Sequence, residues 1–421
     1  MTPAARLQAT IEVLESLEQT GQPADRFLRD WFRARRYAGS KDRAAVGERV
    51  FAILRRKASL GWRMQSSAPR ALVIAALAED GKTEAEIDVL FDAARYAPAA
   101  LSDAERVALA NPPQDSPPLH VQGDFPEFLE PELRRAFGDN VLAETQALRE
   151  RAPVDLRVNT LKAARDDVLA VLRADGFAAE ATLYSPHGIR IPAGEGLSAL
   201  SRHAAYESGL FEFQNEAAQI ASLLAQAKPG QRVLDLAAGA GGKSLALAAE
   251  MRNEGDIIAS DIDGKRLSQV EPRAARAGIT IIHPYLIVDE LPQGLFDLVF
   301  VDAPCSGSGT WQRQPELKWR ISQRKLEELN AVQDSLLDQA AAKVVHEGHI
   351  VYATCSVLPC ENEDRITQFL QRHPGFKTIN AASIWQGINS TRAIPGVHDL
   401  FRVSPYLTGT DGFFASVLMR I

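Results

Sequence analysis

The stretch VLDLAAGAGGKSLALA (residues 233–248) decides the fold. It combines a strand-like apolar run, a glycine-rich turn and an apolar helical pattern in immediate succession. Gly239, Gly241 and Gly242 would let the backbone of the turn approach a ligand closely at the amino end of the helix. A strand, turn and helix in this order are typical of the first unit of an α/β fold.

The rest of the carboxyl-terminal half repeats this alternation. DIIASD, FDLVFVDAP and HIVYATCS are further strand-like runs, and GFFASVLMRI ends the chain as another. A long amphipathic pattern predicts a helix over about residues 322–346, and Gly348 stands where a C-cap glycine belongs. Alternation of strands and helices predicts a doubly wound, Rossmann-like α/β sheet.

Three ligand classes compete for the glycine-rich turn. A phosphate-binding P-loop would need glycine in place of Ala237, and the dinucleotide fingerprint would need glycine in place of Ser244. An S-adenosylmethionine-binding turn agrees better, because Asp261 ends the next strand, where its carboxylate would accept the two ribose hydroxyls. We therefore expect S-adenosylmethionine as the cofactor, although a glycine cluster can also serve only a tight turn.

Two of the three cysteines follow strand-like runs. Cys305 comes after Val299–Val301, and Cys355 comes after Ile350–Tyr352. Ligands of open α/β sheets bind outside the carboxyl ends of the strands, so both thiols are predicted to face one crevice. The odd number of cysteines argues against a disulfide framework, and Cys355-x4-Cys360 lacks the spacing of a zinc site. The alternative is that free cysteines are small buried hydrophobes, above all Cys360.

Composition is that of an ordinary globular protein. The 421 residues are 46% hydrophobic and 24% charged, and the length suffices for two or three domains. No apolar run approaches the roughly 18 residues of a membrane span, and the segment MTPAARLQATIEVLESLEQ is amphipathic rather than a signal peptide. We expect a cytoplasmic monomer that needs neither a membrane nor a metal ion.

The charge of the chain is unevenly distributed. The net charge is −7, yet residues 26–70 hold 13 Lys and Arg against 3 Asp and Glu. Cations interleaved with aromatic residues are the footprint of an RNA-binding surface. A solvated helix face above buried aromatics is the alternative. The aromatic residues interleaved with these cations include Phe27, Trp31, Phe32, Tyr37 and Trp62.

Segments of different character predict the domain organisation. Residues 1–110 have helical spacing and few strand-like runs, which predicts a small all-α domain. Four prolines within residues 111–118 predict a linker. Residues 119–205 mix both patterns and predict a small α+β subdomain, and residues 206–421 form the doubly wound domain.

Together these segments resemble the RNA cytosine-5 methyltransferases of the Sun/RsmB type over about residues 125–421. VDAPCSGSGT followed by RQPELKWR is the most specific match, and YATCSVLPCENE is the second. RVNTLK, FQNEAAQIASLL, SDIDGKRL and TGTDGFFASVLMR also resemble family segments. LDLAAGAGGKS resembles the cofactor loop, although the family often has Ala-Pro in place of Gly239-Ala240. The segment 27–56 resembles, more weakly, the NusB-like RNA-binding domain of the ribosomal RNA members.

The resemblance implies transfer of a methyl group from S-adenosylmethionine to C5 of a cytosine in RNA, expected to be 16S ribosomal RNA. Cys355 is implied to be the nucleophile that adds to C6, Cys305 to assist breakdown of the adduct, and Asp302 to hydrogen-bond the cytosine N3/N4 edge. Lys243 is expected to contact cofactor or base, or else to cap the loop through a salt bridge. A tRNA substrate, or a non-catalytic RNA-binding protein that keeps the scaffold, is the alternative. The expected cofactor-binding residues are Ala237, Ala238, Gly239, Ala240, Gly241, Gly242, Lys243, Asp261, Arg266, Asp289 and Asp302.

Overall fold

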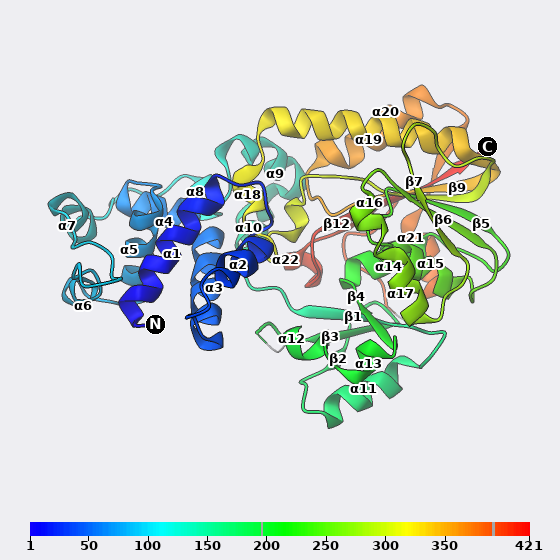
Figure 1. Cartoon of the computed structure of the whole chain (residues 1–421). Coiled ribbons are helices and arrows are strands. Elements are labelled where there is room, and N and C mark those ends of the chain that lie inside the picture. The colour runs from blue at the N-terminus through cyan, green and yellow to red at the C-terminus, as the bar shows by residue number, and fades with distance from the viewer. Residues whose placement is uncertain (195–196, 390–391) are drawn as a thin grey trace. The chain divides into compact units, whose positions relative to one another are not determined.

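The computed structural model describes residues 1–194, 197–389 and 392–421, which form two compact units (Figure 1). The first unit comprises Met1–Glu150 and Trp311–Arg320, and the second comprises Arg151–Thr310 and Ile321–Ile421. Within these described ranges, no helix is both long enough and apolar enough to span a bilayer.

The first unit is built from helices. Helices α1 (Pro3–Glu18), α3 (Ser40–Arg55) and α5 (Pro69–Glu79) pack together, and each contributes apolar side chains at helical spacing to one core. Every regular element between residues 1 and 110 is a helix, as the periodicity predicts. The other α-helices of the unit are α2 (Ala24–Arg33), α4 (Lys57–Met64), α6 (Glu84–Leu90), α7 (Asp103–Ala110), α8 (Leu119–Gln122), α9 (Glu130–Phe137), α10 (Val141–Ala147) and α18 (Leu317–Arg320), and 3₁₀ turns lie at Glu127–Leu129 and Gly138–Asn140.

Two segments belong to this unit that the sequence pattern grouped with later regions. Residues 119–150 join the amino-terminal helices through buried Asp124, whose carboxylate accepts hydrogen bonds from Ser59 N and Oγ at 2.8 and 3.0 Å. Residues 311–320 join through buried Lys318, whose Nζ donates to the Asp124 carbonyl at 3.1 Å. Compact packing units need not coincide with domains, so the proposed domain boundaries stay a prediction.

The second unit begins with a small antiparallel sheet in the order β2-β3-β1-β4. Helix α11 (Arg165–Ala174) packs on this sheet, and the two share an apolar cluster that includes the buried Leu156, Leu172 and Ile189. Helix and strand are mixed here, as the sequence pattern predicts. The strands are β1 (Val154–Val158), β2 (Glu180–Ala181), β3 (Gly188–Ile191) and β4 (Phe211–Phe213), and two short helices, α12 (Leu197–Leu200) and α13 (Ala204–Glu207), lie between β3 and β4 in the chain.

The main sheet has eight strands in the order β10-β12-β9-β8-β5-β6-β7, and β11 pairs with β12. Strands β5 to β9 are parallel, whereas β10, β11 and β12 are antiparallel to their neighbours. The strand order reverses between β5 and β8, and such a switch point is where open α/β sheets bind ligands. The predicted Rossmann-like sheet is therefore confirmed. Its strands are β5 (Arg232–Leu236), β6 (Asp256–Asp261), β7 (Ile282–Leu286), β8 (Phe296–Asp302), β9 (Val344–Thr354), β10 (Phe376–Ile379), β11 (Phe401–Val403) and β12 (Phe413–Arg420).

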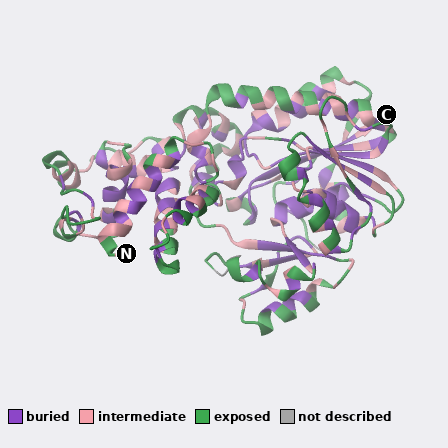
Figure 2. Ribbon diagram, in the orientation of Figure 1, coloured by how far each residue is buried: buried purple, intermediate pink, exposed green. Residues whose placement is uncertain are grey.

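Helices cover both faces of this sheet. Figure 1 shows α19 (Gln323–Lys343) and α20 (Glu363–Arg372) on one side of the strands, opposite α14 (Glu216–Leu224), α15 (Gly242–Glu250) and α17 (Val270–Ala277). The buried strands beneath exposed outer helix faces are visible in Figure 2. The remaining elements are α16 (Gly264–Leu267), α21 (Ala381–Ile388), α22 (Pro405–Thr408) and 3₁₀ turns at Ser308–Thr310 and Pro359–Glu361.

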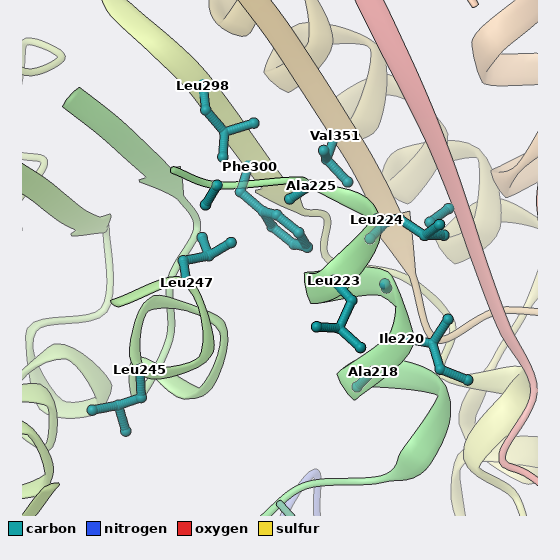
Figure 3. Packing of buried hydrophobic residues seen from close by; sticks show 14 of the residues in the cluster. Ala218, Ile220, Leu223, Leu224, Ala225, Leu245, Leu247, Leu298, Phe300 and Val351 are labelled. Carbon is teal, nitrogen blue, oxygen red and sulfur yellow. The ribbon is translucent and has the colours of Figure 1, made fainter. Parts of the chain in front are cut away.

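Successive side chains of β8 enter different cores, because strand side chains alternate between the two faces of a sheet. Leu298 and Phe300 pack against α14 and α15, as Figure 3 shows, whereas Val299 and Val301 pack against α19 and α20. Both faces are thus buried, which explains the unbroken apolar runs in the sequence.

The predicted end of the long helix is wrong. Helix α19 ends at Lys343, and Val344 already belongs to β9, so Gly348 lies inside a strand instead of capping a helix. Between Val344 and His349 the strand shifts register against β8, and Glu347 has φ +62° within this bulge. A Cβ on Gly348 would lie 2.9 Å from the Val345 carbonyl oxygen, so the glycine serves the bulge.

Candidate active site

The structure brings Cys305 and Cys355 together at the carboxyl edge of the main sheet. Asp302, the last residue of β8, pairs in register with Ala353 of β9. Cys305 follows β8 after a short turn, and Cys355 follows β9 directly. Their Sγ atoms are 3.4 Å apart, and both residues are half-buried free thiols. The predicted juxtaposition of the two thiols at one sheet edge is therefore observed.

The surroundings of Cys305 keep it protonated. Its hydrogen bond with Cys355 and its burial raise the pKa of the Cys305 thiol well above the ordinary value, and the charge of Glu361 acts in the same direction. A protonated Cys305 can donate a hydrogen bond to the Cys355 sulfur. A thiolate is the reactive form of cysteine, so this environment directs Cys305 away from the role of nucleophile.

Lys243 and Asp302 form an ion pair beside the thiols. Lys243 Nζ lies 2.6 Å from Asp302 Oδ2, with side chains 17% and 27% exposed. Burial by itself lowers the pKa of Lys243, but the attraction of Asp302, with smaller contributions from Cys355 and Asp235, outweighs this and raises it. Lys243 is therefore a cation close to Cys355. The salt bridge joins the first turn of α15 to the end of β8, which agrees with the expectation that Lys243 caps the loop.

The predicted cofactor loop adopts a conformation that requires its small residues. Ala237, Gly239 and Gly241 have φ values of +70°, +58° and +77°. Gly239 N donates to Asp261 Oδ2 at 2.7 Å, so the carboxylate at the end of β6 fixes the loop. Ala238 N donates to the Ser260 carbonyl at 2.9 Å, which ties the loop to the same strand. Gly241 then caps α15, and the amino end of that helix opens directly from the turn.

The loop fits S-adenosylmethionine, a ligand rich in hydrogen-bond donors. Asp235 is fully buried at the end of β5, and its Oδ2 accepts a hydrogen bond from Ser244 Oγ. Its Oδ1 has no hydrogen-bond partner among the described residues. A buried oxygen without a partner is costly, and a donor on a ligand would satisfy it. Burial raises the pKa of Asp235 to about 7, so a nearby ligand cation would favour its charged form.

Arg266 and Asp289 occupy different positions relative to the loop. A Cβ on Gly239 would lie 2.4 Å from Arg266 Nη2, so the exposed Arg266 side chain lies directly over the turn. Asp289 is exposed in the bend after β7. It comes two residues after Ile287, whose N–H donates to the Asp261 carbonyl at 2.9 Å. Both residues stay candidates for cofactor binding.

Arg273 also stabilises the cofactor loop, and sequence reasoning missed this residue. Arg273 Nη1 donates to the Ala240 carbonyl at 2.6 Å, and its Nη2 donates to Glu212 Oε2 at 2.9 Å. Arg273 thereby connects the loop to β4 of the small sheet. A charged residue on a helix offers no sequence signal for such a contact.

Sequence reasoning also missed a carboxylate behind the cysteines. Glu361 is fully buried and accepts hydrogen bonds from the hydroxyls of Ser306 and Ser356. The repeated Cys-Ser dipeptide, Cys305-Ser306 and Cys355-Ser356, was the available signal. Among the described residues, no three His, Cys, Asp or Glu side chains gather as metal ligands would.

Comparisons with known proteins identify the family of this chain. The family model for the 16S rRNA methyltransferase RsmB/F matches residues 221–419, and the RsmF/B-like ferredoxin-like domain matches residues 125–195. Ribosomal RNA small subunit methyltransferase B of Sodalis glossinidius is 32% identical over 330 residues, which cover 77% of this chain and 70% of that protein. The chain belongs to the RsmB/F family. This confirms the family that the sequence motifs indicated.

Other members of the RsmB/F family match over a similar length. The protein of the same name from Enterobacter sp. is 33% identical over 310 residues, and the chain covers 66% of its length. The probable ribosomal RNA small subunit methyltransferase B of Synechocystis sp. is 31% identical over 318 residues, which cover 73% of this chain and 69% of that protein. RsmB/F proteins are S-adenosylmethionine-dependent methyltransferases, so the family supplies the cofactor that the loop fits.

Solved structures share the fold. The crystal structure of PH0851 aligns with a TM-score of 0.77 at 25% identity and covers 99% of both chains. The structure of NSun6 from Pyrococcus horikoshii with SFG aligns with a TM-score of 0.61 at 20% identity, covering 70% of this chain and 98% of that one. At that identity the second match shows the fold alone.

Proposed function

We propose that this protein transfers a methyl group from S-adenosylmethionine to C5 of a cytosine in 16S ribosomal RNA, through a covalent bond between Cys355 and C6. The family supports the cofactor and the ribosomal RNA. The observation that supports C5 as the methyl acceptor is the pair of thiols, whose Sγ atoms lie 3.4 Å apart beside the Lys243–Asp302 pair. Methyl transfer to an exocyclic amine or a hydroxyl needs no cysteine, whereas C5 of cytosine must first be activated by a nucleophile at C6.

The chemistry proceeds by covalent catalysis. The Cys355 thiolate adds to C6, so that an S–C6 bond forms and the ring electrons move toward C5. S-adenosylmethionine, when bound, would supply an electrophilic methyl group for the new C5–methyl bond, with S-adenosylhomocysteine as the leaving product. A base then removes the proton from C5, the C5–C6 double bond is restored, and the S–C6 bond breaks to release the Cys355 thiolate.

Each neighbour of Cys355 has a distinct part in this proposal. Protonated Lys243 stabilises the negative charge of the thiolate before attack and after release. Cys305, held as a thiol 3.4 Å away, hydrogen-bonds the departing Cys355 sulfur and so assists breakdown of the adduct. Asp302, anchored by Lys243, faces the N3/N4 edge of the base and polarises the ring.

The target base must be unpaired when it reacts. A cytosine stacked in a helix does not reach a site at the edge of a sheet, so it must be single-stranded or flipped out, which costs a few kcal/mol. A second RNA-binding surface offsets that cost. The stretch 26–70 of the first unit supplies the cations for it, and Arg35 stacks 3.6 Å over the Trp31 ring.

The test compares three single variants on a 16S ribosomal RNA transcript with labelled S-adenosylmethionine. Cys355→Ala should abolish methylation, because the nucleophile is lost. Cys305→Ala should instead accumulate an RNA–protein adduct that survives a denaturing gel. Cys360→Ala is the matched control and should behave as the wild type. Methylation by Cys355→Ala, or a product other than 5-methylcytosine, would contradict the proposal, and preferential methylation of tRNA would replace its substrate.

A further inference from the structure

The two cysteines begin matching Cys-Ser dipeptides that meet at one carboxylate. Ser306 Oγ and Ser356 Oγ both donate to Glu361 Oε2, at 2.5 Å each. We propose that Glu361 is a positioning residue that sets the spacing of Cys305 and Cys355 and makes the two thiols unequal. This inference rests on the proposed function, to which it adds the residue that separates the roles of the cysteines.

Donors from three elements converge on Glu361. Ser306 N donates to Oε1 at 2.8 Å, and Gln333 Nε2 of α19 donates to the same oxygen at 3.1 Å. Gln333 also donates to the Pro304 carbonyl at 3.0 Å, one residue before Cys305. Tyr352 Oη donates to the Glu361 carbonyl at 2.6 Å, which fixes the glutamate to β9. The loops that follow β8 and β9 are therefore tied through a single side chain.

The network leaves the backbone next to both thiols little freedom. Ser308 Oγ lies 2.9 Å from Ser356 Oγ and accepts a hydrogen bond from Val357 N at 2.9 Å. Gly309 N donates to the Cys355 carbonyl at 2.9 Å. Each of these bonds joins the loop after one strand to the loop after the other. A buried polar network of this kind favours one conformation over its alternatives.

Burying a carboxylate is costly, and this cost argues for a role beyond packing. Glu361 is fully buried, and four hydrogen bonds from uncharged donors offset its lost hydration. Replacing such a buried group with an apolar one of similar size is often neutral or stabilising for a fold. A carboxylate next to two thiols also has an electrostatic effect that no apolar side chain reproduces.

That effect falls differently on the two thiols. The titratable groups around Cys305 are Cys355, Glu361 and Tyr352, and the charge of Glu361 disfavours the thiolate of Cys305. Lys243, a cation paired with Asp302, lies close enough to Cys355 to interact with it electrostatically. Two chemically identical groups thus lie in opposite fields. Burial, the hydrogen bond with Cys355 and the charge of Glu361 favour the protonated form of Cys305.

The experiment measures the reactivity of each thiol directly. Initial rates of alkylation by iodoacetamide are resolved for Cys305 and Cys355 by mass spectrometry across a pH series, without RNA or cofactor. In the wild type, Cys355 should react at lower pH than Cys305. In Glu361→Gln the reaction of Cys305 should extend to lower pH, and turnover should fall about a hundredfold, as expected for a displacement of about 1 Å in a reacting group.

Glu363→Gln is the matched control, because it removes the same charge two residues later. Glu363 pairs with Arg402 at 3.5 Å, so the alkylation order should be that of the wild type. Ser306→Ala combined with Ser356→Ala keeps the charge of Glu361 and removes the two hydroxyl groups that bind it. Turnover should therefore fall, while Cys305 should still react only at higher pH than Cys355. If Glu361→Gln does not fold, this double variant decides, and wild-type turnover in it would overturn the inference.

Folded Glu361→Gln with the alkylation order and turnover of Glu363→Gln would also overturn the inference. Because alkylation needs no RNA, this outcome is distinguishable from failure of the proposed function. A wild-type protein that keeps unequal thiols but makes no 5-methylcytosine contradicts the function alone.

Discussion

Replacing Gly309 with alanine tests how tightly the Cys355 loop is held. A Cβ on Gly309 would lie 2.0 Å from the carbonyl oxygen of Gly412 and 2.5 Å from its carbon. Backbone atoms cannot rotate away as the end of a side chain can, so the two segments must separate. Separation also weakens the bond from Gly412 N to the Gly309 carbonyl and that from Gly309 N to the Cys355 carbonyl, each 2.9 Å long.

Gly309→Ala should lower the free energy of unfolding by about 2 kcal/mol, which is in the range for overpacking at a tightly packed site. For a unit of this size, that cost lowers the midpoint of thermal unfolding by roughly 4–8 °C. Because Cys355 moves with the segment, turnover should fall about tenfold or more. Differential scanning calorimetry and a methylation assay measure the two effects.

The matched control is Gly387→Ala. Gly387 is exposed in α21, and a Cβ there would meet no atom within 4 Å. Alanine in a helix should leave the unfolding midpoint unchanged or raise it slightly, because the substitution stabilises the fold by about 0.4–1 kcal/mol. If Gly309→Ala unfolds at the temperature of the wild type and methylates at its rate, the reasoning about this backbone contact is refuted.

Three further predictions concern the cofactor loop and the buried carboxylates. Burial raises the pKa of Asp235 to about 7, above its unfolded value, so the stability that protonated Asp235 contributes is complete at low pH and is lost as the pH rises through 7. The difference in thermal unfolding midpoint between Asp235→Asn and the wild type, measured by calorimetry, should therefore shift in favour of the variant between pH 5 and pH 8, and a constant difference would contradict the burial argument. Gly239→Ala places a side chain at φ +58° against Arg266 and should weaken S-adenosylmethionine binding about tenfold by titration calorimetry, whereas unchanged affinity would exclude the loop as the site. Asp261→Asn removes one of the two acceptor oxygens that bind Gly239 N and Asp263 N, so it should weaken the same binding, and equal affinity would show that this carboxylate is not needed.

The sheet and its site edge were predictable from local sequence. Buried parallel strands need continuous apolar runs, and RVLDL and DIIASD coincide with β5 and β6. Chain direction then places every parallel strand end at one edge, which is why two cysteines 50 residues apart in sequence were expected to meet. Their 3.4 Å separation agrees with that expectation.

Other features depend on contacts that no local pattern records. Val344 and Val345 continue the helical periodicity of α19, but pairing with β8 outweighs it and starts the strand early. The charged motif ENE (residues 361–363) is typical of a surface, yet Glu361 is buried and accepts hydrogen bonds from the loops after β8 and β9 and from α19. Residues 311–320 follow the Cys305 loop in sequence, yet they pack with the first unit through Lys318.

The covalent mechanism is tested most directly by identifying the residue bound to RNA in the Cys305→Ala adduct. The trapped complex is digested with trypsin and nuclease, and the modified peptide is sequenced by tandem mass spectrometry. We predict a 5-methylcytidine nucleotide linked through Cys355. A nucleotide on any other residue, or an unmodified Cys355 in a variant that still methylates RNA, would contradict it.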